Sequence, residues 1–183
     1  MLARFLCEDK QFDIAEQAAW HAIGLFPEKG EEYRICGSHR VLAQVYQSKG
    51  EIEKAIHHFE VALGIASSFD WHEEPFWIHF GLADLFCDEG RFDEAKTHIK
   101  CAKSHTVNNT YNSGRAMELQ AWVWYQQHRF EEARSEALRA ADFYEKLGAA
   151  KDVGDCREFL QRIQKELDTA VPPSQSDSNC ELL

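Results

Sequence analysis

The chain has 183 residues, 44% of them hydrophobic, and a formal net charge of -11 at pH 7. This length and apolar content are typical of one soluble folded domain. The negative charge argues against nucleic acid and anionic membrane surfaces as partners, because both are bound through clustered cations. No run of residues approaches the ~18 apolar residues of a membrane span, so we predict no transmembrane segment.

A short segment ending in alanine recurs four times along the chain. Its copies end at Ala15, Ala55, Ala95 and Ala133, which are 40, 40 and 38 residues apart. Alanines also recur twelve residues before each copy and seven residues after it. These further columns are Ala3, Ala43, Ala83 and Ala121, and then Ala22, Ala62, Ala102 and Ala140. A fixed period between 20 and 50 residues is the signature of a protein built from stacked repeats.

The columns predict two amphipathic helices in each repeat, joined by a tight turn. The four units cover about 1–29, 34–69, 75–105 and 113–147, and an amphipathic capping helix follows at 151–168. Residues 1–169 form the predicted domain, and the Pro- and Ser-containing tail at 170–183 is predicted to be disordered. The first unit begins with fewer residues than the others, which favours the hypothesis that the chain is a piece of a longer protein.

The turn between the two helices of a unit requires a left-handed backbone, which glycine adopts at little cost. Gly50 and Gly90 stand there in the second and third units. Lys10 and His128 replace glycine in the outer units. We therefore expect the outer turns to be less favourable.

These columns resemble the tetratricopeptide repeat: a Leu-Ala pair, a bulky residue three positions after the alanine, then the turn and two further alanines. The resemblance covers about 1–147, although its period is longer than the usual 34 residues. His39, His79 and Met117 also replace an aromatic residue of the family pattern. Membership would imply an all-α, right-handed superhelical array of about four antiparallel helix pairs plus the cap. It would also imply a non-catalytic module that binds a peptide or helix of a partner protein.

In the tetratricopeptide family, the first helices of the units line the concave face. Carried over by matching columns, this implies a binding groove in which aromatic rings lie beside charged and amide groups, a mixture common at binding hot spots. The predicted groove residues are Arg40, Gln44, Trp77, Phe80, Asp84, Asp88, Arg115, Glu118, Trp122 and Tyr125. The alternative is that these rings simply pack between neighbouring units.

Other functions find less support in the residues. Relatives that hold the C-terminal carboxylate of chaperones use inward Asn with Lys or Arg, whereas Gln44, Asp84 and Trp122 occupy corresponding positions here; this argues against chaperone tails. We find no phosphate-binding loop, no nucleophile with a partner and no His or Cys spacing typical of a metal site. We therefore predict no enzyme activity, no cofactor and no metal. Six cysteines without a C-x-x-C pair and no signal peptide favour the cytoplasm.

Two alternative roles remain open from the sequence. Similar repeats form the C-terminal sensor region of larger signalling NTPases, which would suit a truncated first unit. The last four residues also have the outline of a prenylation box, with Cys180 as the lipidated residue of a membrane-tethered adaptor. The partner, the binding face and the oligomeric state stay undetermined at this stage.

Overall fold

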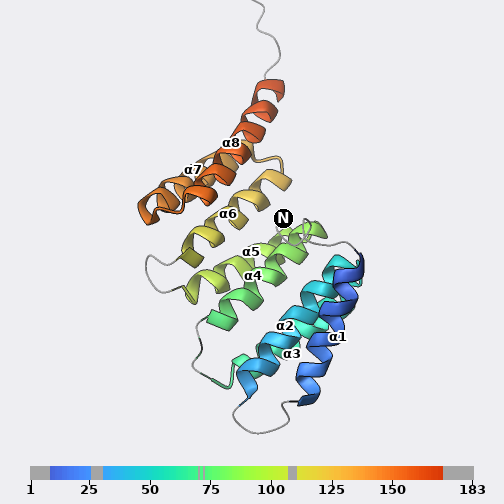
Figure 1. Ribbon diagram of the computed structural model, residues 1–183. Coiled ribbons are helices and arrows are strands. Elements are labelled where there is room, and N and C mark those ends of the chain that lie inside the picture. The colour runs from blue at the N-terminus through green and yellow to red at the C-terminus, as the bar shows by residue number, and fades with distance from the viewer. Residues whose placement is uncertain (1–8, 26–30, 70, 72, 107–110, 171–183) are drawn as a thin grey trace, which may run out of the picture.

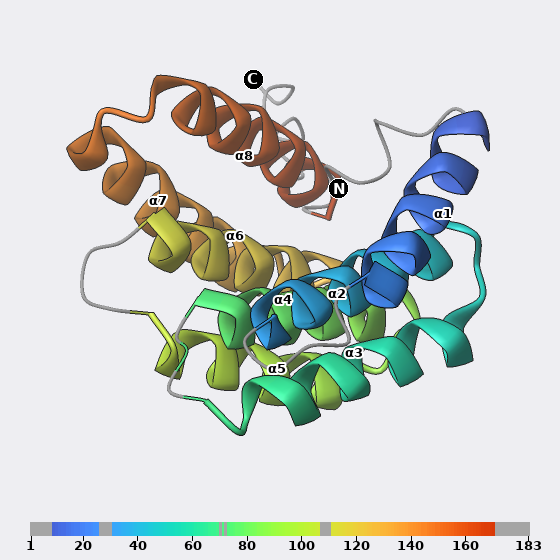
Figure 2. The same cartoon turned by 60° about the horizontal axis from the view of Figure 1, so that its bottom comes forward.

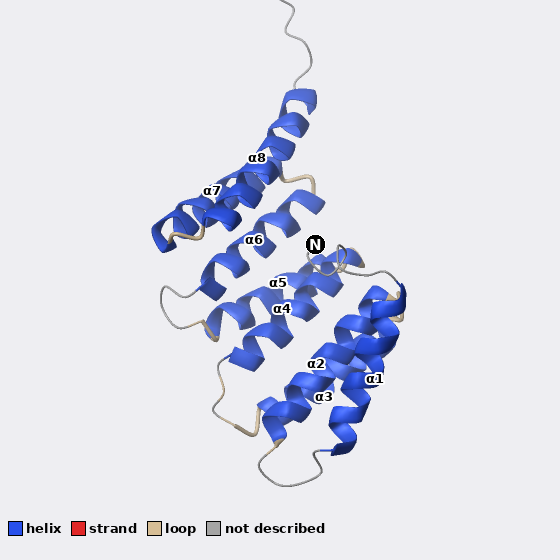
Figure 3. Cartoon of the chain, in the orientation of Figure 1, coloured by secondary structure: helices blue, strands red, loops and turns tan. Residues whose placement is uncertain are grey.

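The fold was analysed in a computed structural model, which describes residues 9–25, 31–69, 71, 73–106 and 111–170. These residues form eight α-helices and no strand, which confirms the predicted all-α class. The helices are α1 (Asp9–Leu25), α2 (Glu32–Ser48), α3 (Ile52–Ala66), α4 (Glu73–Asp88), α5 (Phe92–Ser104), α6 (Tyr111–Gln126), α7 (Phe130–Leu147) and α8 (Ala150–Ala170). Figure 3 shows this all-helical content. The predicted first helix of the first unit lies before the described residues. The predicted tail at 170–183 also lies outside them, apart from Ala170, which is the last residue of α8.

The helices are arranged as hairpins that lie side by side in chain order. The close antiparallel pairs are α2 with α3, α4 with α5, and α6 with α7, and α4 lies between α2 and α6 (Figure 1). Figure 2 shows α2, α4 and α6 as one row, with α3 and α5 on the outer side and α1 and α8 rising at the two ends of the row. This arrangement is that of an α-helical repeat protein.

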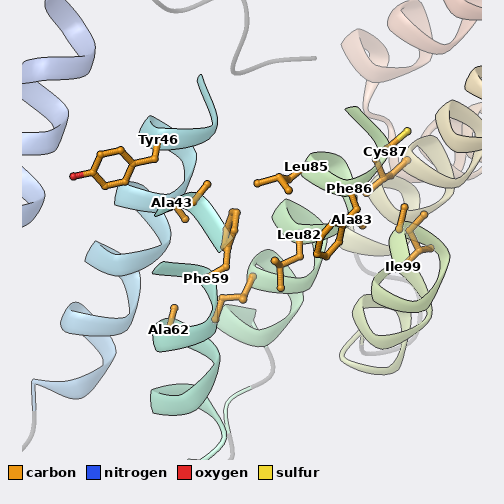
Figure 4. Close-up of a cluster of buried hydrophobic side chains, with 14 of the residues drawn as sticks. Ala43, Tyr46, Phe59, Ala62, Leu82, Ala83, Leu85, Phe86, Cys87 and Ile99 are labelled. Carbon is orange, nitrogen blue, oxygen red and sulfur yellow. The ribbon is translucent and has the colours of Figure 1, made fainter. Parts of the chain in front are cut away.

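The repeated alanines are buried among these helices. Ala43, Ala83 and Ala121 are fully buried on α2, α4 and α6, and Ala55, Ala95 and Ala133 are fully buried on α3, α5 and α7. Small side chains allow two helices to approach, and larger ones fill the space beside them. Figure 4 shows Ala43 and Ala83 with Phe59, Leu82, Phe86 and Ile99 in the core that runs from α2 to α5.

Equivalent positions hold residues of different size in different hairpins. In the second hairpin two such positions hold the buried Cys36 and Ala66, whereas in the fourth the same positions hold Gly114 and the fully buried Tyr144. A Cβ atom on Gly114 would lie 2.6 Å from the Tyr144 ring. Likewise a Cβ atom on Gly81 of α4 would lie 2.4 Å from Cζ of Phe59 on α3. Each glycine therefore makes room for one large ring.

Candidate functional site

A cleft lies where α4, α6 and α8 meet. Its volume is about 420 Å³, which falls within the roughly 300–1,000 Å³ typical of ligand pockets. Five of the ten predicted groove residues line it, namely Phe80, Asp84, Arg115, Glu118 and Trp122. The other lining residues are Leu119 of α6, Ala137 of α7, and Lys151, Asp155, Cys156, Glu158, Phe159 and Arg162 of α8.

A partly buried polar network lies in one wall of the cleft. Arg115 donates to Oε2 of Glu118 over 2.8 Å, and the hydroxyl of Tyr144 donates to the same oxygen over 2.9 Å. The Cys156 thiol lies 3.7 Å from Oε1 of Glu118. Burial raises the pKa of the Glu118 carboxyl, although Arg115 and Tyr144 act in the opposite direction. These contacts join α6, α7 and α8, so the network sets the spacing of the helices that form the cleft.

Charged side chains at the rim of the cleft make fewer ion pairs and hydrogen bonds than those of the polar network. Asp84 accepts a hydrogen bond from the side-chain amide of Gln47 over 3.1 Å. Within the described part of the chain, Lys151, Asp155 and Glu158 of α8 make no ion pair and no side-chain hydrogen bond with another residue. The rim therefore offers both signs of charge to a ligand, around an apolar floor of Leu119, Trp122 and Phe159.

The aromatic residues predicted for the fourth unit are half covered by α8. The Trp122 and Tyr125 rings stack with centroids 5.5 Å apart, and Phe159 lies 5.8 Å from Trp122 and 5.4 Å from Tyr125. The guanidinium of Arg162 lies over both rings, and the Tyr125 hydroxyl donates to Glu166 over 3.3 Å. Trp122 reaches the cleft, whereas Tyr125 serves to anchor α8.

The other predicted groove residues do not line the cleft. Arg40 of α2 donates to the buried carboxylate of Glu74 over 2.9 Å. The Trp77 ring packs edge-on against Phe76 and Phe80. Gln44 lies part-buried on α2, and Asp88 is exposed at the end of α4. Half of the predicted set therefore lines the cleft, whereas Arg40 joins α2 to α4 and Tyr125 joins α6 to α8.

The sequence did not predict the contribution of α8. On the predicted amphipathic capping helix, Phe159 and Cys156 fall on the apolar face, and Glu158 and Arg162 fall on the opposite face. In the structure the boundary between these two faces points into the cleft, so both kinds of residue line it together. A signal was available, because Lys151, Asp155, Glu158 and Arg162 recur at spacings of four, three and four residues on one side of the helix.

The remaining sequence predictions concern chemistry and the membrane. In 9–25, 31–69, 71, 73–106 and 111–170, no three His, Cys, Asp or Glu side chains gather as a metal site requires. Cys36, Cys87 and Cys156 are buried free thiols, and burial raises the pKa of each to about 12. No helix in the described part of the chain could span a bilayer. Cys180, the predicted lipidation residue, lies outside the described residues.

Comparison with known proteins gives a likeness in fold. No model of a known protein family matches the chain, and no curated protein matches it either. Among solved structures, the crystal structure of BtubC (BKLC) from P. vanneervenii matches with a TM-score of 0.60. The match covers 95% of this chain and 79% of that chain, at 17% sequence identity. At this identity the likeness concerns the course of the backbone alone.

Proposed function

We propose that this protein is a non-catalytic interaction module of the tetratricopeptide type, which binds a peptide or helix of a partner protein between α8 and the row formed by α4 and α6. The right-handed superhelix implied by the family resemblance is part of this proposal. The observation that carries it is the cleft, because five residues chosen from the repeat pattern line one cavity.

The lining of the cleft defines the kind of segment that would bind. Leu119, Trp122 and Phe159 form an apolar floor, and burial of one large apolar side chain there would contribute ~1.5–3 kcal/mol. Carboxylates and cations surround this floor, so charged residues on both sides of the apolar anchor would orient the segment. We therefore expect a short amphipathic segment with one large apolar residue as its anchor.

Selection from a displayed peptide library, followed by calorimetric titration of the selected peptides, tests this function. Glu158 is exposed at the rim of the cleft, whereas Gln161 is exposed on α8 and does not line it. Glu158→Trp places a large ring at the entrance and should weaken binding at least tenfold (~1.4 kcal/mol). The matched variant Gln161→Trp should bind like the unaltered chain.

Two outcomes would contradict the proposal. The first is a failure to select any peptide whose binding saturates. The second is a set of peptides whose affinity is the same for Glu158→Trp and Gln161→Trp, because such peptides bind another face of the molecule.

A further inference from the structure

Two histidine pairs occupy equivalent positions in neighbouring hairpins. In the second unit, Nδ1 of His39 on α2 lies 3.0 Å from Nδ1 of His58 on α3. In the third unit, Nδ1 of His79 on α4 lies 3.0 Å from Nδ1 of His98 on α5. Both members of the pair are shifted by the repeat step of 40 residues. Each hairpin is thus joined across its two helices by a bond between two imidazoles.

Such a bond needs a bare Nδ1 on one of the two rings, so it is lost only when both rings are cations. One ring donates from a protonated Nδ1, and the other accepts at a bare Nδ1 and carries its own proton on Nε2. A first extra proton on the free Nε2 of the donating ring keeps the bond, but it places a cation in a partly buried site. A second proton, on the accepting Nδ1, places two N–H groups opposite each other at 3.0 Å, and the hydrogen bond is then lost.

The surroundings of both pairs favour the neutral rings. His58 is 6% exposed and His79 is 8% exposed. Tyr46 of α2 stacks on His58, Trp20 of α1 meets the same ring edge-on, and Phe86 of α4 stacks on His98.

Burial is the main cause that lowers the pKa of all four imidazoles, and it lowers that of His79 to about 4. Neighbouring imidazoles add to this effect: His57 of α3 acts on the first pair, and His105, after α5, acts on His79. Two carboxylates oppose it, Glu16 of α1 at His58 and Glu94 of α5 at His98. The effect of burial outweighs that of these carboxylates, so the pKa of each imidazole stays below its usual value.

We propose that the two histidine pairs form an acid-sensitive switch that loosens the α2–α3 and α4–α5 hairpins together. Its effect on ligand binding rests on the proposed function: Phe80 follows His79 along α4 and lines the cleft, so separation of α4 from α5 displaces a wall of the binding site. The switch itself requires no ligand, and it is tested on the free protein.

The direction of the pH effect follows from the lowered folded-state pKa values. Between the unfolded pKa of about 6.5 and the lower folded values, the unfolded chain binds more protons than the folded one. The stability of the folded protein therefore falls as the pH drops through this window. Above the window, these rings do not change the stability. His79 alone, with a folded pKa of about 4, raises the unfolding constant roughly 30-fold between pH 7.5 and pH 5.

Urea unfolding of the full chain at pH 7.5 and pH 5 tests the switch. The double variant His58→Asn/His98→Asn replaces one ring of each pair by an amide, whose oxygen can accept from the remaining imidazolium. We expect the unfolding constant of the unaltered chain to rise at least tenfold on acidification, and that of the double variant to rise several-fold less. His21→Asn, at an exposed position of α1, should behave like the unaltered chain.

The proposal is overturned if the unaltered chain loses no stability at pH 5, or if the double variant loses as much. Should the double variant not fold, nitrogen NMR of the imidazoles in the unaltered chain decides. At pH 5.5 the four rings should keep the shifts of neutral imidazole, with opposite tautomers in each pair. Rings that titrate near pH 6.5 would refute the switch whatever the peptide-binding result.

Discussion

At the scale of single residues, the turns between paired helices depend on the left-handed backbone. Gly50 and Gly90 have φ of 74° and 72°, and Gly148, which ends α7, has φ of 71°. His128 occupies the same position between α6 and α7 with φ of 58°. A side chain at this φ costs roughly 1–2 kcal/mol relative to glycine, so the prediction of a less favourable turn at His128 has a physical basis in the structure.

His128→Gly should therefore stabilise the protein by about 1 kcal/mol. The gain is reduced by loss of the edge-on contact between the His128 and Phe130 rings, whose centroids are 5.8 Å apart. Urea unfolding at neutral pH measures the difference. His128→Ala is the control, because it removes the ring and keeps the unfavourable backbone, so it should give no gain. Equal stability of the glycine and alanine variants would contradict the argument.

At the scale of helices, the contact between α3 and α4 depends on one ring and one glycine. Phe59 is fully buried, and its ring occupies the space that a Cβ atom on Gly81 would need. The position of Gly81 is taken by Val41 in the second hairpin and by Leu119 in the fourth. The packing between units therefore follows local complementarity of volume as well as the repeat pattern.

Gly81→Ala should destabilise the protein by about 1–3 kcal/mol, because either the Phe59 ring or the backbone of α4 must move. Gly64→Ala on α3 is the matched control, since nothing lies within 4 Å of its added Cβ atom. That substitution should stabilise the helix by up to about 1 kcal/mol. Chemical unfolding measures whether the free energy of unfolding falls for Gly81→Ala and rises for Gly64→Ala. A neutral or stabilising Gly81→Ala would show that α3 and α4 separate easily.

The sequence predicted most helices but little of how α8 is used. The alanine columns define α3, α5 and α7, because a small residue is required wherever two helices approach, and such a requirement repeats with the unit. The contact of Phe159 and Arg162 with Trp122 and Tyr125 follows no repeat. It depends on the angle at which α8 leaves Gly148, which no local pattern encodes. The histidine pairs are an intermediate case: His39 and His79, like His58 and His98, recur at the 40-residue step in the sequence, but the bond that joins the two helices does not show there.

At the scale of the whole molecule, stability is expected to vary along the row of helices. The described contacts of α4 reach α2, α3, α5 and α6, whereas α1 packs mainly on α2. Two large side chains of α1 stay partly in solvent: Ile14 is 67% exposed, and Trp20, whose ring meets His58 of α3, is 45% exposed. In a repeat array each unit is stabilised by its neighbours, so the unit with fewest neighbours opens at the lowest free energy.

Hydrogen exchange of the native protein should follow this gradient, with amides of α1 exchanging at least tenfold faster than those of α4. Part of what holds α1 is polar, because Lys49, at the C-terminal end of α2, binds Asp13 over 2.8 Å and Glu16 over 2.7 Å. Exposed ion pairs of this kind stabilise a contact modestly. Lys49→Met should therefore speed exchange in α1 several-fold and leave α6 and α7 unchanged. Two outcomes would contradict this description: uniform protection from α1 to α8, or an equal effect of Lys49→Met on every helix. Either one would mean that the chain opens as one cooperative unit, and that its stability is not a sum over neighbouring hairpins.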